Sequence, residues 1–338
     1  MTSSQVLSYV TFVYAAAAIL YWADWIFRKK ELGSAATGLS LVGVVGNAAG
    51  FGLRWHESYL HGVGHIPLSN LYESLVFFSL TAMAVYLVVE RQYKLRVLGA
   101  FVTPLAFLAL AYASLSSDVN AQIQPLLPAL KSNWLTAHVL TCFLGYAAFA
   151  VAFGLANLYL IKNGEKRFPG AAAGETASFC AILLLYAMKK GMGASTATAF
   201  AVAVSGAVLG GVLAYVVAGL LFRGTEKTRA LLLDRLPEAD VLDELMYQNI
   251  LFGFLFLTVG IITGAVWANS AWGKYWTWDP KETWSLITWL IYAALIHMRL
   301  ARGWLGARSC YFSIVGFCAV LFTWFGVNLL SGLHSYAR

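Results

Sequence analysis

Residues 248–300 read QNILFGFLFLTVGIITGAVWANSAWGKYWTWDPKETWSLITWLIYAALIHMRL, and this stretch decides the fold class of the protein. It holds two apolar runs, 248–268 and 282–300, each long enough to cross about 30 Å of hydrocarbon as an α-helix. Over residues 272–289 tryptophans are mixed with charged side chains, a composition typical of a membrane surface rather than a membrane interior. The stretch therefore predicts two membrane-spanning helices joined by an aromatic connection.

The rest of the chain repeats this pattern of apolar runs. Of its 338 residues, 60% are hydrophobic and 12% are charged, which excludes an ordinary soluble globular protein. We predict an all-α polytopic membrane protein, a single integral-membrane domain over residues 1–338 with about eight core transmembrane helices. A possible extra helical hairpin occupies 171–222, which is rich in alanine, glycine and valine. The predicted spans lie near 6–27, 35–53, 71–89, 97–115, 134–161, 248–268, 282–300 and 310–330.

Basic residues gather in alternate loops, and this distribution predicts the orientation of the chain. The loops 28–34, 90–96, 162–169, 223–247 and 299–308 contain 16 of the 23 lysines and arginines. By the positive-inside rule these loops face the cytoplasm or its equivalent, so the tryptophan-rich connection and the C-terminus face outward. The formal charge of +7 thus reports orientation and predicts no nucleic-acid partner. We expect a bacterial inner membrane, with the thylakoid membrane as the alternative, and an amphipathic segment lying on the inner surface over 223–247.

Five tryptophans fall within the short aromatic connection, more than interfacial anchoring of two helices needs. They predict a shallow aromatic surface for a flat hydrophobic ligand, whose polar edge would meet nearby charged groups. The alternative is a dense aromatic belt at the membrane interface. The tryptophans are Trp272, Trp276, Trp278, Trp284 and Trp289, and the charged residues are Lys274, Asp279, Lys281 and Glu282.

Two histidines, His138 and His334, flank this connection on the predicted outer side. An imidazole in an apolar helix needs a ligand or a hydrogen bond. Two histidines from different helices suit the axial positions of a metal held in its own four-nitrogen ring, because zinc usually takes more protein ligands. The alternative is that both are hydrogen-bonded loop residues. We assign no ligand role to His65, and we expect His56 and His61 to be loop residues.

His297 lies 15 residues beyond Glu282, which is roughly 22 Å into the predicted span and closer to the inner side. It therefore cannot share a macrocycle with the outer pair. One interpretation is an axial ligand of a second, intramembrane site. No other histidine of this chain is predicted at that depth, so the opposite ligand would come from another polypeptide or be absent. The alternative is a histidine bonded to a backbone carbonyl or to the polar rim beside Arg299.

Several segments resemble the CcsA/ResC family, the integral-membrane subunit of the system II cytochrome c synthase. The tryptophan-rich connection, about 267–289, resembles the WWD domain of that family, and WDPKE continues it at 278–282. Further matching segments are GHIPLSNLYESLVFFS at 64–79, YQNILFGFLFLTVGIITGAVWA at 247–268 and GVNLLSGLHSY at 326–336. The resemblance covers most of the chain except 171–222.

The resemblance implies a role for each matching residue. His138 and His334 are similar to the outer pair of haem iron ligands, and His297 is similar to the intramembrane ligand. The family's second intramembrane histidine belongs to a CcsB/ResB-like subunit, which is therefore an expected partner. The haem surface, where attachment takes place, corresponds to Trp272, Trp276, Trp278 and Asp279, with Trp284 as a haem-binding neighbour.

The resemblance also implies a function in cytochrome c biogenesis. Haem b is expected to enter from the inner side, move outward, and become attached through thioether bonds to the CXXCH motif of apocytochrome c. The expected partners are the CcsB-like subunit, apocytochrome c, haem and membrane lipid, and the enzyme class is a cytochrome c haem lyase acting with CcsB. The alternatives are a haem exporter or chaperone without ligase activity, a haem-handling WWD protein of system I, and a non-catalytic membrane anchor.

Overall fold

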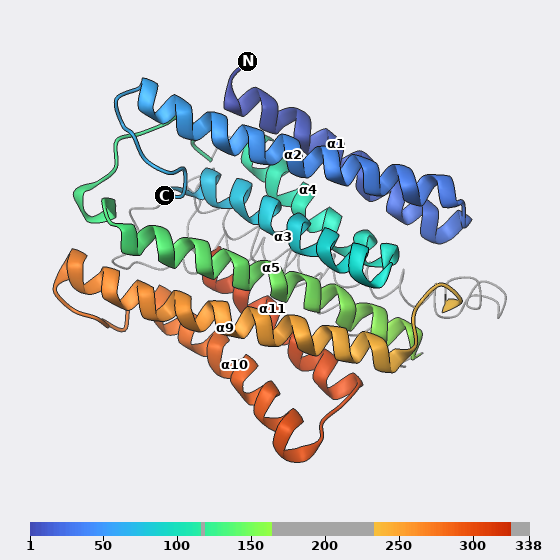
Figure 1. Cartoon of the computed structure of the whole chain (residues 1–338). Helices are drawn as coiled ribbons and strands as arrows, with labels where there is room; N and C mark the ends of the chain where they lie inside the picture. The colour runs from blue at the N-terminus through green and yellow to red at the C-terminus, as the bar shows by residue number, and fades with distance from the viewer. Residues whose placement is uncertain (116–118, 164–232, 326–338) are drawn as a thin grey trace, which may run out of the picture. The chain divides into compact units, whose positions relative to one another are not determined.

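The computed structural model describes residues 1–115, 119–163 and 233–325, which form helices and, within these ranges, no strand (Figure 1). Eight helices of these ranges are long and apolar enough to cross a membrane, so the predicted all-α architecture with eight core spans is confirmed. The elements are α1 (Ser3–Phe27), α2 (Lys30–Leu60), α3 (Leu71–Tyr93), η1 (Arg96–Leu98), α4 (Gly99–Leu115), η2 (Pro128–Leu130), α5 (Asn133–Lys162), α9 (Ala239–Trp272), α10 (Pro280–Arg302) and α11 (Ala307–Trp324).

Polar side chains define where the first helices begin. The Thr2 hydroxyl accepts a hydrogen bond from the Gln5 backbone N–H at 3.3 Å, and the Gln5 side chain accepts one from the Thr2 backbone N–H at 3.0 Å. Asn70 starts α3 in a similar way, because its side-chain oxygen accepts from the Glu73 backbone N–H at 2.9 Å. Such caps satisfy N–H groups that have no partner within the helix.

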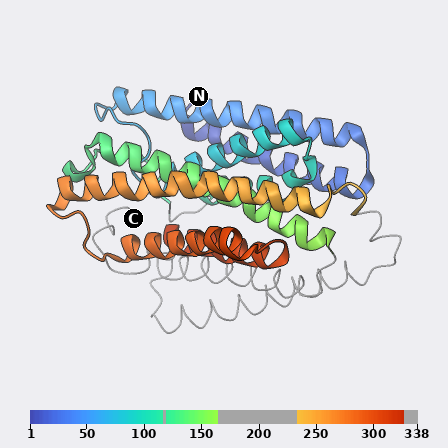
Figure 2. The same cartoon turned by 60° about the horizontal axis from the view of Figure 1, so that its bottom comes forward.

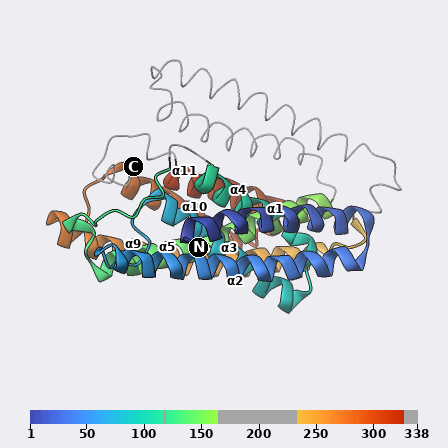
Figure 3. The ribbon, with the colours of Figure 1, turned by 90° about the horizontal axis from the view of Figure 1, so that it is seen from above.

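The contacts divide the chain into two compact units that share α5 and α9. Unit 1 contains Met1–Gly154 and Phe252–Thr277, and unit 2 contains Leu155–Leu251 and Trp278–Tyr336. In unit 1, α1 packs against α2 and α4, and α3 packs against the same two helices (Figures 1 and 3). In unit 2, α10 packs against α11. The prediction of one domain over residues 1–338 stays a prediction.

Within unit 1, α5 and α9 approach each other closely, and their ribbons run side by side in Figure 2. A Cβ atom placed on Gly145 of α5 would lie 3.0 Å from the Gly253 carbonyl oxygen and 3.2 Å from the Leu257 backbone nitrogen. Both neighbours are backbone atoms, so they cannot turn aside as a flexible side chain does. Glycine at these positions therefore permits a helix spacing that any larger residue would increase.

A buried carboxylate in unit 1 has a complete set of donors. Glu90 of α3 is 5% exposed. One of its oxygens accepts from the Tyr21 hydroxyl at 2.8 Å and the Tyr86 hydroxyl at 2.5 Å, and the other accepts from the Thr37 hydroxyl at 2.5 Å. The Arg96 Nε atom lies 3.7 Å from the second oxygen. Because a buried charge without partners is costly, these donors explain how a membrane helix accommodates Glu90.

The structure changes two of the predicted boundaries. Helix α9 begins at Ala239, so residues 239–247 form its first turns instead of a separate segment on the membrane surface. The charged residues of those turns are accommodated because Asp243 pairs with Arg299 inside unit 2. Helix α2 likewise continues to Leu60 instead of ending near residue 53, since the charge of Arg54 is paired within the protein. The expected hairpin at 171–222 lies outside the described residues.

The close approach of α5 and α9 predicts the effect of enlarging Gly145. Gly145→Leu should destabilise the protein by about 1–3 kcal/mol, because the new side chain meets fixed backbone. Unfolding of the purified protein in detergent, followed as a function of denaturant, measures the change.

Gly38→Leu is the matched control, because a Cβ atom at Gly38 of α2 meets nothing within 4 Å. Equal stability of the two variants would contradict the proposed packing of α5 against α9.

Candidate functional site

His138 lies on α5 in unit 1 and is held by a backbone carbonyl of α9. Its ring nitrogen Nδ1 is 2.7 Å from the Gly260 carbonyl oxygen. A carbonyl oxygen only accepts hydrogen bonds, so Nδ1 must carry a proton. The lone pair of the neutral ring is then on Nε2. A histidine that binds a metal commonly uses its second ring N–H in this way, which fixes the tautomer and the direction of the ring.

The surface of α9 is shaped to receive this imidazole. A Cβ atom on Gly264 would lie 2.6 Å from His138 Nδ1 and 2.8 Å from its Cε1 atom. The Cys142 sulfur, one turn further along α5, is 3.6 Å from the same Nδ1. The side chain of His138 is half-buried, so the ring is enclosed on the α9 side without being sealed within the unit.

One tryptophan of α9, Trp267, lies beside this histidine, and a second, Trp272, packs against Trp267. The Trp267 ring lies nearly parallel to the His138 ring, with centroids 6.4 Å apart and an interplanar angle of 14°. Trp267 is 2% exposed, and its indole N–H donates to the Ala129 carbonyl at 2.8 Å. The Trp272 ring meets the Trp267 ring edge-to-face at 4.9 Å. Unit 1 thus joins the predicted ligand His138 to Trp272, the first tryptophan of the predicted haem surface.

The tryptophan-rich connection is shorter in the structure than its sequence pattern indicates. Helix α9 ends at Trp272 and α10 begins at Pro280, so only residues 273–279 lie outside helices. The chain turns through Gly273, which has a φ of 73°. Tyr275 is 60% exposed and Trp276 is half-buried. These residues belong to the segment Phe252–Thr277 of unit 1, which also contains Gly260 and Trp267.

Trp278 and Asp279 belong to unit 2 and differ sharply in exposure. Trp278 is 70% exposed and has a φ of 59°, a backbone conformation that bulky residues seldom adopt. Asp279 is 6% exposed and caps α10, since its side chain accepts from the Lys281 backbone N–H at 3.0 Å. Glu282 completes a capping box, and Pro280 occupies the first turn. The contacts of Asp279 with Lys281 and Glu282 therefore determine where α10 starts.

Trp284 packs inside unit 2. Its ring lies 4.2 Å from the Phe322 ring of α11, at an interplanar angle of 49°. Its backbone carbonyl accepts from the Thr288 hydroxyl at 2.9 Å and from the Thr323 hydroxyl at 3.2 Å. Trp284 is half-buried, so part of its ring surface remains accessible next to the start of α10.

His297 has a very different environment from His138. It is exposed on α10, and its side chain forms no hydrogen bond with a described residue. Arg299, two residues further on, is anchored: its Nη1 atom is 2.6 Å from Asp243, its Nη2 atom is 3.2 Å from Glu244, and its guanidinium lies 4.2 Å from the Tyr247 ring centre. Among the described residues, the His297 ring bonds neither to a backbone carbonyl nor to the polar groups around Arg299, which were the alternative for this histidine.

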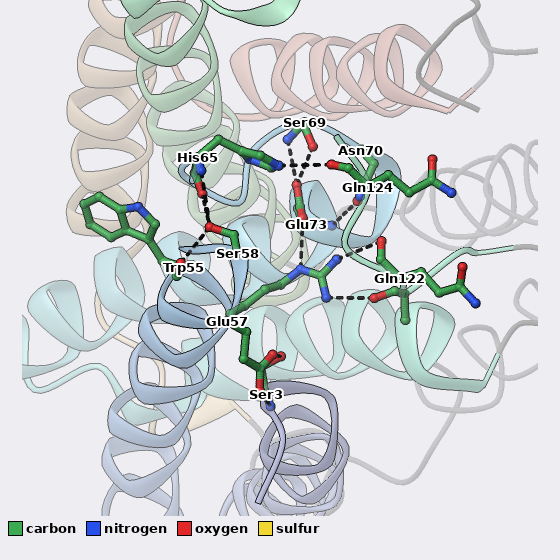
Figure 4. Close-up of polar contacts among 12 residues, drawn as sticks. Ser3, Trp55, Glu57, Ser58, His65, Ser69, Asn70, Glu73, Gln122 and Gln124 are labelled. Carbon is green, nitrogen blue, oxygen red and sulfur yellow. Dashed lines mark hydrogen bonds and ion pairs between the residues drawn. The ribbon is translucent and has the colours of Figure 1, made fainter. Parts of the chain in front are cut away.

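The remaining histidines separate into three cases. His334 lies outside the described residues, so its pairing with His138 stays a prediction. His56 and His61 are exposed. His65 is 9% exposed, and its ring nitrogens face the carbonyl oxygens of Ile66 at 2.8 Å and Gln124 at 3.4 Å (Figure 4). Residues 1–115, 119–163 and 233–325 contain no group of three or more histidine, cysteine, aspartate or glutamate residues that could hold a bare metal ion.

Sequence reasoning missed the residues that hold His138. Gly260 and Gly264 are separated by the GxxxG spacing that brings helices close together, which is a readable signal for a helix contact. The hydrogen bond between Trp267 and the Ala129 carbonyl joins residues far apart in the chain, so no local sequence pattern predicts it. Charged residues within apolar runs, such as Arg54 and Glu73, also signal a buried pair, because each requires a partner there.

Comparisons with known proteins agree with this architecture. The family model described as "Cytochrome C assembly protein" matches residues 68–334. A cytochrome c biogenesis protein CcsA of Gloeobacter violaceus is 38% identical over 95% of this chain and 91% of its own length. CcsA proteins of Synechocystis sp. and Rippkaea orientalis are 39% and 40% identical, each over 94% of this chain and 92% of their own length. This chain therefore belongs to the CcsA family of cytochrome c assembly proteins, is a multi-pass membrane protein, and functions in cytochrome c biogenesis.

Proposed function

We propose that this chain is the haem-handling subunit of a cytochrome c synthase. It binds haem b as a substrate and presents it to the CXXCH motif of apocytochrome c, in a complex with a CcsB-like membrane subunit. The observation that carries the proposal is the imidazole of His138, whose Nδ1–H is bound to the Gly260 carbonyl and whose ring lies beside Trp267, against which Trp272 packs. This arrangement directs a neutral imidazole lone pair away from α9, as an axial iron ligand requires.

The residues around His138 suit haem better than a bare metal ion. A bare ion needs several protein ligands, whereas haem supplies four nitrogens itself and needs only axial ligands. The wide apolar ring of haem is also matched by large aromatic side chains: Trp272 ends α9, and Trp276 lies in the turn that follows it. In the proposal, His138 is one axial ligand and His334 is the other.

Thioether formation requires that each cysteine thiol be aligned with a vinyl group of haem, and it consumes no further reagent. Each cysteine S–H adds across one vinyl group: a bond forms between the sulfur and one vinyl carbon, and the hydrogen goes to the other vinyl carbon. No electrons are gained or lost overall, and the iron remains ferrous. The protein accordingly contributes orientation, with His138 holding the iron and the tryptophans holding the ring near its vinyl edge. One of the two histidines leaves when the substrate histidine binds the iron.

Trp278 and Asp279, the last two residues of the turn between α9 and α10, take separate roles in the proposal. Trp278, at 70% exposure, offers an accessible aromatic face for haem or for the apocytochrome. Asp279 acts through the backbone: by capping α10 it fixes the end of the turn that carries Trp276 and Trp278. Trp284 adds an aromatic surface within the first turns of α10.

His297 is proposed as an axial ligand of a second haem site within the membrane. Its exposure on α10 supports a partner polypeptide as the source of the opposite ligand. Arg299, bonded to Asp243 and Glu244, limits rotation of the inner end of α10 and so maintains the direction in which His297 faces. The charge distribution of the loops supports an orientation with this end inside and the tryptophan-rich turn outside, in a bacterial inner membrane or a thylakoid membrane.

Replacing His138 tests the proposed function directly. The chain is expressed with a CcsB-like subunit and a CXXCH-containing apocytochrome in a host without its own maturation system, and covalent haem is measured after denaturing electrophoresis. His138→Ala should lower the yield at least about tenfold, because even groups that only orient a metal ligand contribute roughly 10–100-fold in affinity or activity.

His61→Ala replaces an exposed histidine and serves as the control. Absence of covalent haem with the unaltered chain, while haem remains bound to it, would favour an exporter over a synthase. Absence of bound haem altogether would favour a membrane anchor.

Replacing His297 tests the second site. His297→Ala should reduce the haem that copurifies with the complex while leaving its unfolding transition in detergent unchanged, because the side chain is exposed and bonds to no described residue. Leu300→Ala, at a position 74% exposed on the same helix, is the control for general effects on that surface. Unchanged haem content in His297→Ala would rule out the intramembrane site.

A further inference from the structure

The segment between α4 and α5 is fastened to unit 1 by a buried arginine. Arg54 of α2 is 1% exposed, and its Nε atom donates to Glu73 at 2.9 Å. Its Nη1 atom donates to the Ala121 carbonyl at 2.8 Å, and its Nη2 atom lies 3.5 Å from the Gln122 carbonyl (Figure 4). The planar guanidinium thus binds a carboxylate and the loop backbone at once, which a lysine cannot do with the same geometry.

Glu73 is itself held from several directions. The oxygen that does not face Arg54 accepts from the Ser69 backbone N–H and from the Ser69 hydroxyl, both at 2.8 Å. The Arg54 guanidinium lies 4.6 Å from the ring centre of Tyr72, so an aromatic face covers it as well. Separating this buried pair would leave a charge without a partner, which is strongly destabilising. The first part of the loop, at Ala121 and Gln122, is therefore attached to a buried ion pair of unit 1.

The second part of the same loop contacts Trp267. Residues 128–130 form the short helix η2, in which Leu130 is 8% exposed. The Ala129 carbonyl of this turn accepts the indole N–H of Trp267 at 2.8 Å. The loop thus connects the Arg54–Glu73 pair to the tryptophan that lies beside His138.

The contact with Trp267 supplies the restraint that the His138 hydrogen bond lacks. The Gly260 carbonyl oxygen and the Cys142 sulfur both approach the imidazole at one atom, Nδ1, at 2.7 Å and 3.6 Å. The Trp267 ring lies nearly parallel to the imidazole, at 14°, and so restricts tilting of the imidazole plane. Trp272 packs against Trp267 at 4.9 Å and restricts Trp267 in turn.

We propose that Trp267 is a positioning residue for His138, and that Arg54 holds the loop that keeps Trp267 in place. The inference rests on the proposed function, because it concerns His138 as an axial ligand of haem. The plane of the ligating imidazole is set jointly by three groups: the Gly260 carbonyl, the Trp267 indole and the Ala129 carbonyl. The plane and hydrogen bonding of an axial imidazole tune the iron, so loss of this restraint changes the spectrum and potential of bound haem.

The test uses the full chain purified with haem in complex with the CcsB-like subunit. Trp267→Phe keeps an aromatic face but removes the N–H that binds Ala129. It should weaken haem binding about tenfold, as typical for an outer-shell partner of a metal ligand. It should also shift the visible bands and the midpoint potential of the bound haem.

Trp25→Phe is the matched control, since Trp25 is a buried tryptophan of the same unit, 4% exposed, that packs against Phe101. Arg54→Lys is the second variant. It keeps the positive charge beside Glu73 but loses the guanidinium hydrogen bonds to the Ala121 and Gln122 carbonyls. The haem spectrum is expected to shift in the same direction as in Trp267→Phe. Should Trp267→Phe fail to fold, this variant decides the question alone.

The outcomes separate the inference from the proposed function. A wild-type haem spectrum in His138→Ala would overturn the proposed function and the inference with it. Loss of the spectrum in His138→Ala, together with wild-type bands, potential and affinity in Trp267→Phe and Arg54→Lys, would leave the proposed function standing and overturn the inference alone.

Discussion

The close approach of α5 and α9 is the constraint on which the candidate site depends. Gly145 and Gly253 let the two backbones come near each other, and Gly260 and Gly264 continue the same contact toward His138. At this spacing a backbone carbonyl of α9 reaches the imidazole directly. A helix carbonyl oxygen can accept more than its one intrahelical backbone bond, and the Gly260 carbonyl also accepts from the Thr263 hydroxyl at 3.1 Å. Wider spacing would remove the bond between His138 and the Gly260 carbonyl.

Buried charged groups also determine how the helices are arranged. Arg54 with Glu73, Glu90 with its hydroxyl donors, and Arg299 with Asp243 each lie inside a unit with several partners. In hydrocarbon such groups are costly unless paired, so each pair specifies one arrangement of the helices that carry it. Arg54 also binds loop backbone, which extends this effect from the helices to the chain between them.

Hydropathy predicted the number and type of the helices because backbone groups inside a membrane must be satisfied within each span. It misplaced the ends of α2 and α9, where charged residues are paired inside the protein and the helix continues past them. His138 could be selected from sequence because an imidazole in an apolar run needs a partner. Its partners could not, because the contacts of Ala129, Gly260 and Trp267 with one another or with His138 depend on helix register and loop path. The DPKE sequence at 279–282 did carry a readable helix-start signal, and the structure uses Asp279 and Glu282 in that way.

His138 and His297 show two solutions to presenting a histidine from a membrane helix. His138 is oriented by its own chain, through the Gly260 carbonyl and the Trp267 ring, so its direction is set before any ligand binds. His297 is exposed, and only the helix that carries it is fixed, through Arg299. An oriented imidazole suits a step in which reacting atoms must be aligned, since misplacement there lowers the rate. An exposed imidazole suits a site completed by a partner, because the second polypeptide then supplies the missing orientation together with its own ligand.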